Sequence, residues 1–513
     1  MRLSARQPRL KRDVPKLQKS LKRRRESYWQ KQGEKMALDL FQQMSRRVPA
    51  YKDFLKKHKV DPSKIKTIED FKNVPLIDKD NYLRKYSRQD LCWDGKFAKN
   101  QWVISTTSGS TGEPFYFPRT AKQDEQYAIT AELYLRENFR IHEKSTLYIN
   151  AFAMGAWIGG LFTYEAVKRV ADRGYALSVI NPGINKSEVI NSVRKLGPDF
   201  DQVIIGCYPP ILKDIIDLGI QEGLDWQKYN LGLVFSAEGF GEEFRDYIIK
   251  YGKLANPYTS TLNHYGTVDL GTMSHETPAS VFIRREAVNN AELFAALFGE
   301  TRKQPTLTQY FPEMFFFEEV DGGVVCSAYS GLPLVRYNLK DNGGVLSLKE
   351  VRQIYQQVGL DLSTELKRAG IDKTLWNLPF VYLYERSDFS VTFSGAQIYP
   401  EEIRRALHER VLEDKITGRF TMVSDYDKNM RNFLEINVEL KRGVEPSKEL
   451  SKNIMSLVVE RLLAENSEYR SSYSESKAKL HPKIVLWPHG HPNYFHEKGK
   501  QLWSQKNKRA RWQ

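Results

Sequence analysis

The segment STTSGSTGEP (residues 105–114) concentrates small hydroxyl side chains and glycines in one stretch. Backbone N–H groups and Ser or Thr hydroxyls both donate hydrogen bonds to phosphate oxygens, so such a loop is able to cradle a polyphosphate. It is not a Walker A loop, because that motif needs G-x-x-x-x-G-K-[ST], and here Gly112 is followed by Glu113. The alternative interpretation of the segment, taken alone, is a solvated linker.

Four further segments follow this loop along the chain: SAEGF (236–240), NHYGTVDLG (263–271), LPLVRYNLKD (332–341) and ERSDFSVTFSGAQIYPEEI (385–403). Together with the loop they resemble the ordered motifs of the adenylate-forming superfamily, which includes acyl-CoA synthetases, luciferases and peptide-synthetase adenylation domains. The last two segments are most similar to the phenylacetate–CoA ligase branch, which includes capsule-biosynthesis relatives. The resemblance implies that the loop wraps the triphosphate of ATP.

The resemblance gives the residues around the nucleotide their expected roles. It implies that the phosphates are bound by Ser108, Gly109, Ser110, Thr111 and Gly112. Glu238 and Tyr265 are expected to border the adenine, with Gly266 and Thr267 in the same nucleotide-binding segment. Asp269 stands where the family has a Mg²⁺-binding Glu; it is one methylene shorter but is still able to bind a hard cation through oxygen.

The resemblance also implies a ribose site, a hinge and a catalytic lysine. Asp341 is expected to accept hydrogen bonds from the ribose hydroxyls, and Arg386 to lie beside ribose and phosphate as a catalytic residue. Asp388 falls at the hinge, where the small domain turns between adenylation and transfer poses. The catalytic lysine, whose ammonium would stabilise the transition state at the α-phosphate, is assigned to Lys500, with Lys498 as the competing candidate.

The activity that the resemblance implies is ATP-dependent activation of a carboxylic acid. The carboxylate attacks the α-phosphate of ATP to give an acyl-adenylate and pyrophosphate, and hydrogen-bond donors and Mg²⁺ stabilise the phosphoryl oxygens. A thiol then takes the acyl group, so the expected cofactors are ATP, Mg²⁺ and coenzyme A. Two alternative acceptors stay open, the pantetheine of a carrier protein and an amine.

Several residues depart from the family pattern. The phosphate loop carries the acid Glu113, which repels phosphate unless it points away, and Asp269 replaces a Glu. No cysteine occurs between Tyr265 and Cys326, where some relatives carry a zinc-binding cluster. These departures leave a third hypothesis, a degenerate nucleotide-binding scaffold without catalysis.

The acyl pocket is expected along NAFAMGAWIGGLF (150–162), which corresponds to the pocket-lining segment of the family. Phe152 and Trp157 are its candidate walls, and Tyr208 in GCYPP (206–210) is a third. Aromatic walls suit an aryl or fatty acid. The alternative for all three side chains is an ordinary place in the hydrophobic core.

The expected fold class is α/β. Apolar runs at 147–152, 176–180, 202–206 and 232–238 alternate with helical stretches at 188–197 and 210–220, which predicts a parallel sheet with ligands beyond its carboxyl ends. After residue 386 a helix from Pro400, a helix at 447–464 and strands at 419–423, 433–440 and 483–487 predict a small α+β domain. The resemblance implies a large N-terminal α/β adenylation domain with a small mobile C-terminal domain. The expected boundaries are 1–25 (a basic flexible tail), 26–385 (the large adenylation domain) and 386–513 (the small C-terminal domain with a basic tail).

The net charge of +15 is concentrated at the two ends of the chain. Residues 1–25 hold eleven Lys or Arg and one Asp, and residues 498–513 hold six Lys or Arg and no acid. These ends are either solvated or a handle for an anionic partner such as nucleic acid, lipid or an acidic carrier. The three scattered cysteines and the lack of a membrane-length apolar run favour a cytoplasmic protein with no transmembrane segment.

Overall fold

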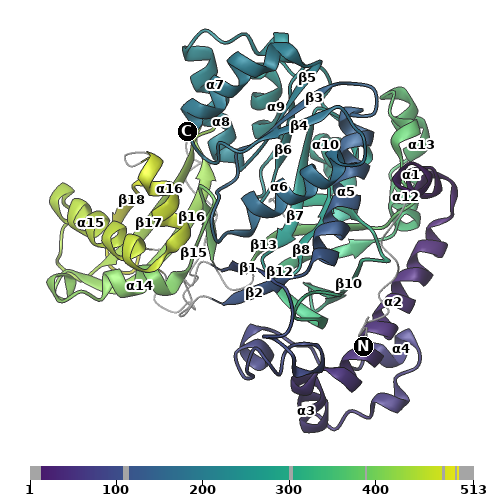
Figure 1. The fold of residues 1–513 in the computed structure, drawn as a ribbon. Helices are drawn as coiled ribbons and strands as arrows, with labels where there is room; N and C mark the ends of the chain where they lie inside the picture. The colour runs from purple at the N-terminus through teal and green to yellow at the C-terminus, as the bar shows by residue number, and fades with distance from the viewer. Residues whose placement is uncertain are drawn as a thin grey trace.

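A sheet of eleven strands runs through the larger part of the molecule, in the order β10-β11-β12-β13-β9-β8-β7-β6-β5-β3-β4 (Figure 1). The computed structural model describes residues 13–107, 115–299, 304–386, 390–476, 480–491 and 494–495, without the side chains of residues 385, 386, 475 and 476. No helix in these ranges is long and apolar enough to cross a bilayer.

The parallel half of the sheet agrees with the predicted alternation of strands and helices. Its strands are β3 (Thr146–Asn150), β4 (Leu177–Ile180), β5 (Gln202–Cys207), β6 (Gly232–Phe235) and β7 (Thr261–Thr267). Apolar side chains pack on both faces, as is usual for parallel strands. One face is covered by α7 (Lys186–Leu196), α8 (Pro209–Gln221) and α9 (Glu242–Tyr251), and the other by α5 (Ala121–Phe139) and α6 (Ile158–Ala171).

The other half of the sheet is antiparallel, and the sequence did not reveal it. Its strands are β8 (Gly271–His275), β9 (Thr306–Tyr310), β10 (Phe315–Val320), β11 (Gly323–Ala328), β12 (Leu334–Leu346) and β13 (Phe380–Arg386). A hydrophobic cluster joins this half to α10 (Pro278–Asn289), α11 (Ala291–Phe298), α12 (Leu348–Gln357) and α13 (Leu362–Arg368).

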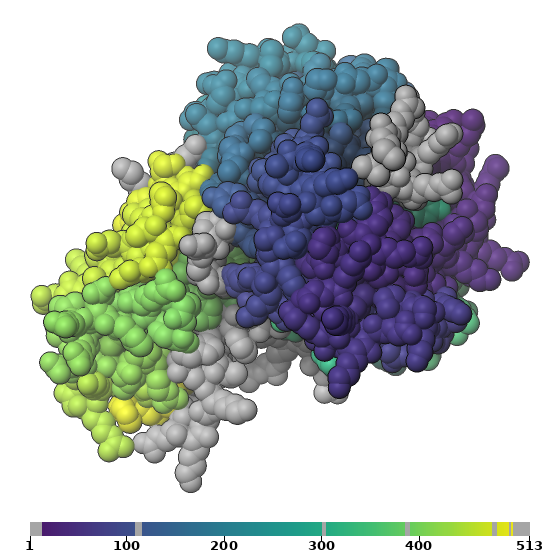
Figure 2. Space-filling view, turned by 60° about the horizontal axis from the view of Figure 1, so that its bottom comes forward, coloured from purple at the N-terminus to yellow at the C-terminus, as the bar shows by residue number. Residues whose placement is uncertain are grey.

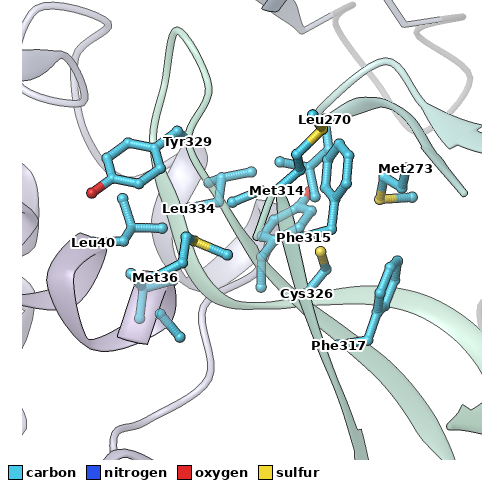
Figure 3. Close-up of a cluster of buried hydrophobic side chains, with 14 of the residues drawn as sticks. Met36, Leu40, Leu270, Met273, Met314, Phe315, Phe317, Cys326, Tyr329 and Leu334 are labelled. Atoms are coloured by element: carbon cyan, nitrogen blue, oxygen red, sulfur yellow. The ribbon is translucent and has the colours of Figure 1, made fainter. Parts of the chain in front are cut away.

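Helices at the N-terminal end pack against the antiparallel strands. They are α1 (Val14–Arg23), α2 (Glu26–Arg47), α3 (Pro49–Lys57) and α4 (Ile68–Phe71). Met36 and Leu40 of α2 face Met314, Leu334 and Tyr329 in one buried cluster (Figure 3). This packing fixes the N-terminal region on the strands that carry the later motifs.

The prediction of a flexible tail is wrong for the part of residues 1–25 that forms α1. Pro15 lies in the first turn of this helix, where its fixed φ suits the helix start, and Asp13 caps it. Val14, Leu17 and Leu21 are buried along one face. Lys22 pairs with Glu137 of α5 at 2.7 Å.

The C-terminal part has a hydrophobic core of its own, formed by residues between 393 and 480. Its elements are β14 (Val391–Phe393), β15 (Ala396–Ile398), α14 (Pro400–Leu407), β16 (Ile416–Tyr426), β17 (Asn432–Leu440), α15 (Lys448–Glu465), α16 (Ser467–Ser476) and β18 (Lys483–Trp487). β17 pairs antiparallel with β16 and parallel with β18. The predicted α+β composition is confirmed, and the space-filling view shows this small domain against one side of the body (Figure 2).

Candidate active site

A short hairpin carries the glycine-rich loop. Its strands, β1 (Val103–Thr106) and β2 (Tyr116–Arg119), pair antiparallel. Beyond them, the Thr107 N–H donates to the Phe115 carbonyl at 3.1 Å, and the Phe115 N–H donates to Thr107 Oγ1 at 3.0 Å. The predicted phosphate-binding residues Ser108, Gly109, Ser110, Thr111 and Gly112 lie outside the described residues, so their role stays a prediction.

Glu238 lies just beyond β6, at the carboxyl edge of the parallel strands where ligands of such sheets bind. Its side chain is buried, and its carbonyl accepts a hydrogen bond from Asn263 Nδ2 at 3.0 Å. Burial disfavours the charged form and raises the pKa of the Glu238 carboxyl to about 7. The preceding Ala237 has a φ of 74°, an unusual conformation for alanine that marks a tight turn.

A buried ion network holds the strands beside Glu238. The Arg245 guanidinium, which is 0% exposed, donates to Glu276 at 2.6 Å and to Glu242 at 2.9 Å. The second oxygen of Glu276 accepts from the backbone N–H of Asn263 at 2.8 Å, and Asn263 in turn holds Glu238. The network therefore fixes the segment that the sequence placed beside the adenine.

The structure brings Tyr265 and Asp341 together, although they lie 76 residues apart in the chain. The Tyr265 hydroxyl donates to Asp341 Oδ2 at 2.6 Å. Asp341 is the register partner of Arg386 across β12 and β13. Gly266 permits the close pairing of β7 with β8, because a Cβ atom there would lie 2.7 Å from the Gly271 carbonyl oxygen.

Asp269 follows β7 and is 5% exposed at its side chain. The Tyr337 hydroxyl donates to its Oδ2 at 2.5 Å, and Lys79 Nζ lies 3.4 Å from its Oδ1. Thr267, two residues earlier, orders this turn by accepting a hydrogen bond from the Leu270 N–H at 3.3 Å. Lys79 is a candidate site residue that the sequence analysis missed, because no local motif distinguishes it from neighbouring lysines.

The segment that carries Lys79 is attached to β12. The Ile77 N–H donates to the Arg336 carbonyl at 3.1 Å, and the Asn338 N–H donates to the Ile77 carbonyl at 2.9 Å. Asp78 pairs with Lys340 at 2.7 Å and caps the helical turn that begins at Lys79. The N-terminal region therefore contributes a fixed cation to a site otherwise built from the sheet.

The residues around Asp269 do not fit a resident magnesium ion. Protein sites for Mg²⁺ use one or two available carboxylates together with substrate phosphates. Here both carboxylate oxygens of Asp269 already have partners, and one of these is an ammonium group. No group of three or more possible metal ligands occurs among the described residues.

The predicted pocket walls come together only in part. Phe152 is buried, and its ring lies edge-on to the Tyr208 ring with centroids 5.3 Å apart. Gly206 lies close to the Phe152 wall, since a Cβ atom there would approach the Phe152 ring to 3.0 Å. Trp157 precedes α6, and in the described part of the chain it makes no ring contact with Phe152 or Tyr208.

The structure does not describe the side chains of four predicted functional residues. Arg386 ends β13, and only its backbone is described. Asp388, Lys498 and Lys500 lie outside the described residues. Their hinge and catalytic roles stay predictions.

The comparisons with known proteins establish the fold. No protein-family model matches the sequence, and no curated protein matches it. Among solved structures, 2-hydroxyisobutyryl-CoA ligase with 2-HIB-AMP and CoA in the thioesterification state aligns over 94% of this chain and 90% of its own, at a TM-score of 0.61 and 14% identity. The same ligase in the postadenylation state with R3-HIB-AMP aligns over 96% and 92%, at a TM-score of 0.54 and 14% identity. The chain therefore has the fold of the adenylate-forming ligases, as its motifs implied.

Proposed function

We propose that this protein is an ATP-dependent carboxylate ligase. A carboxylate oxygen of the acid attacks the α-phosphorus of ATP, and pyrophosphate leaves with the electrons of the broken P–O bond. The sulfur of coenzyme A then attacks the acyl carbon, loses its proton and releases AMP. The fold shared with a ligase captured with an acyl-adenylate and CoA supports this assignment.

The hydrogen bond between Tyr265 and Asp341 is the observation that carries the proposal. It joins two motifs that the resemblance assigns to adenine and ribose, and the β12–β13 register adds Arg386. We propose that Asp341 accepts from the ribose hydroxyls. Tyr265 holds that carboxylate in place and borders the base, and Gly266 and Thr267 belong to the same nucleotide-binding segment.

On the phosphate side of the site, we propose that Lys79 supplies a positive charge to the polyphosphate. Asp269 positions its ammonium group, because the carboxylate is itself anchored by Tyr337. Any magnesium ion arrives with the substrate as MgATP. The loop 108–112 and Lys500 complete the proposed set, with Lys500 bridging the attacking carboxylate and the α-phosphate.

The acid substrate and the small domain are assigned within the same proposal. Phe152 and Tyr208 form an aromatic wall that suits an aryl or fatty acid. We propose that residues 386–513 form a separate domain that turns about Asp388 between the two half-reactions. Coenzyme A is the proposed acceptor, in preference to a carrier-protein pantetheine or an amine.

Carboxylate-dependent exchange of pyrophosphate into ATP tests the proposal on the purified chain with a panel of aryl and fatty acids. Asp341→Asn is expected to lower exchange strongly, because it removes the charged acceptor for ribose. Asp321→Asn is the matched control: Asp321 is exposed in a turn of the same sheet, and its φ of 52° is one that Asn adopts readily. Exchange by Asp341→Asn equal to that of this control would contradict the assigned site. ATP binding without exchange for any acid would favour the scaffold hypothesis. If an acid does support exchange, thiol and amine acceptors are compared with that acid.

A further inference from the structure

The small domain reaches the candidate site through the turn between β14 and β15. The backbone N–H of Gly395 in this turn donates a hydrogen bond to Glu238 Oε1 of the large domain. Gly395 has a φ of 83°, and a Cβ atom there would lie 3.2 Å from the Tyr208 ring. The turn therefore sits between Glu238 and a candidate wall of the acyl pocket.

The turn is built by the small domain itself. Asn432 of β17 accepts from the backbone N–H of Ser394 at 3.1 Å, and the Ser472 hydroxyl of α16 donates to the Ser394 carbonyl at 3.2 Å. These bonds fix the turn to two different elements of the small domain. It therefore moves with that domain as one unit.

A second contact lies on α9. The ring of Tyr426, at the end of β16, lies 5.0 Å from the Phe244 ring. Tyr426 and Met430 both pack against the hydrophobic cluster beneath the parallel strands. This apolar contact buries surface but does not fix how the small domain is oriented. The hydrogen bond from Gly395 to Glu238 is directional.

Glu238 is an unusual residue for its position. A buried carboxyl group is expensive unless it is paired or hydrogen-bonded. Among the described residues, the Glu238 carboxyl group has no ion-pair partner, and it accepts a hydrogen bond from the Gly395 N–H. The hydrogen bond of the carboxyl group is therefore made to the turn of the small domain.

We propose that Glu238 is a positioning residue that holds the Ser394–Gly395 turn in the site and so sets the small-domain pose for acyl transfer. The acyl-transfer part of this inference rests on the proposed function, whereas the docking part does not. The resemblance placed Glu238 beside the adenine. The bond between Gly395 and Glu238 joins the two domains across 157 residues of chain, and no motif reveals this contact.

Docking through Glu238 also implies a dependence on pH. In the docked pose burial raises the pKa of the Glu238 carboxyl to about 7, and this effect outweighs the Gly395 N–H bond, which lowers the pKa. Release of the turn removes that bond but also opens the carboxyl group to water, so its pKa returns toward the ordinary, lower value. The docked pose therefore holds a proton more tightly, so docking is strongest below the released pKa and weakens as pH rises toward about 7.

The titratable groups that interact with Glu238 are neutral over this range. They are Cys207, Tyr208 and Tyr426, whose pKa values are all raised, chiefly by burial. Two acids face these groups from the small domain: Asp425 acts on Tyr426, and Glu468 acts on Tyr208. Their negative charge further disfavours ionisation on this side of the site.

Hydrogen–deuterium exchange of residues 391–398 in the full chain tests the docking without any substrate. Glu238→Ala is expected to raise exchange of this segment about tenfold, the size expected for one lost hydrogen bond to a carboxyl group. Gly395→Ala should do the same from the other side, because its methyl group meets Tyr208. Glu243→Ala, an exposed acid on α9, is the control. Exchange in Glu238→Ala equal to that in the control would overturn the proposal.

Glu238→Gln keeps an oxygen acceptor without a titratable proton, so it tests the proposal even if the alanine variant is unstable. In this variant the deuterium exchange of residues 391–398, corrected for the intrinsic rate, should not change between about pH 5 and 8. In the parent chain it should rise over the same range. The same rise in Glu238→Gln would contradict the role of Glu238.

The activity of the two half-reactions supplies the final test. With an acid that supports exchange of pyrophosphate, the ratio of acyl transfer to adenylation should fall about tenfold in Glu238→Ala. Glu238→Gln should restore this ratio. Equal losses in both half-reactions would reduce Glu238 to a nucleotide-site residue. Changed deuterium exchange without activity in the parent chain would refute the proposed function and leave the docking contact standing.

Discussion

Replacement of Lys79 by methionine separates its two proposed roles, because methionine keeps the length of the side chain and removes the charge. In the structure Lys79 neutralises a buried carboxylate, and in the proposed function it also contacts the phosphates of ATP. The two roles predict two measurable effects. One is a loss of stability without ligand, and the other is a loss of affinity for ATP.

The size of both effects follows from the geometry. At the 3.4 Å between Lys79 Nζ and Asp269 Oδ1, an effective dielectric constant of about 20 gives roughly 5 kcal/mol of Coulomb attraction before desolvation. The lysine side chain is 31% exposed, so solvent screens part of this attraction, and we expect the free energy of unfolding to fall by about 1–3 kcal/mol. Loss of a charge-assisted contact to phosphate, about 1.5–3 kcal/mol, weakens ATP binding by about 10- to 150-fold.

Isothermal titration calorimetry with ATP and urea denaturation measure the two effects. Lys85→Met, an exposed lysine of the same segment, is the matched control and should change neither quantity. The double variant Lys79→Met/Asp269→Asn should regain stability, because the buried carboxylate is gone, but not ATP affinity. Unchanged ATP affinity in Lys79→Met would refute its phosphate role, and unchanged stability would refute the ion pair.

Three further predictions concern the scaffold. Glu276→Ala leaves the buried Arg245 without its 2.6 Å partner, so urea denaturation should show a loss of about 3–5 kcal/mol; a loss no larger than that of a surface variant would mean that the network is unimportant. Gly206→Ala places a methyl group 2.4 Å from the Tyr148 hydroxyl, and thermal denaturation should reveal a cost of about 1–3 kcal/mol unless the ring moves freely. Leu21→Ala should destabilise the protein by about 2–5 kcal/mol because Leu21 is fully buried in α1, whereas a flexible tail would tolerate it without a change in melting temperature.

The sequence by itself determined the fold class and the order of the motifs. The strand at 202–207 is apolar along nearly its whole length and is buried on both faces, which is typical of a parallel strand between helices. Pro209 begins the helix that follows, because its fixed φ suits the first turn. Such signals depend only on neighbouring residues, so they predict the local structure without knowledge of the rest of the chain.

The N-terminal helix shows where a local signal was present but outweighed. Val14, Leu17 and Leu21 have the spacing of one helix face, yet the surrounding lysines and arginines favoured the interpretation as a tail. Tertiary packing decides the buried side of the helix: Val14, Leu17 and Leu21 join the cluster between the N-terminal helices and the antiparallel strands, and Lys22 pairs with Glu137 of α5. The many charged residues in this segment reflect only the exposed face of the helix.

Only the tertiary structure decided which distant residues meet at the site. Lys79 reaches Asp269 because the segment at Ile77 pairs with β12, and Gly395 reaches Glu238 because the small domain docks on α9. No spacing in the sequence encodes these pairs, since each depends on strand register and domain placement rather than on helical or strand periodicity. The motifs therefore indicated the chemistry, whereas long-range packing determined the pairing of Lys79 with Asp269 and the contact of Gly395 with Glu238.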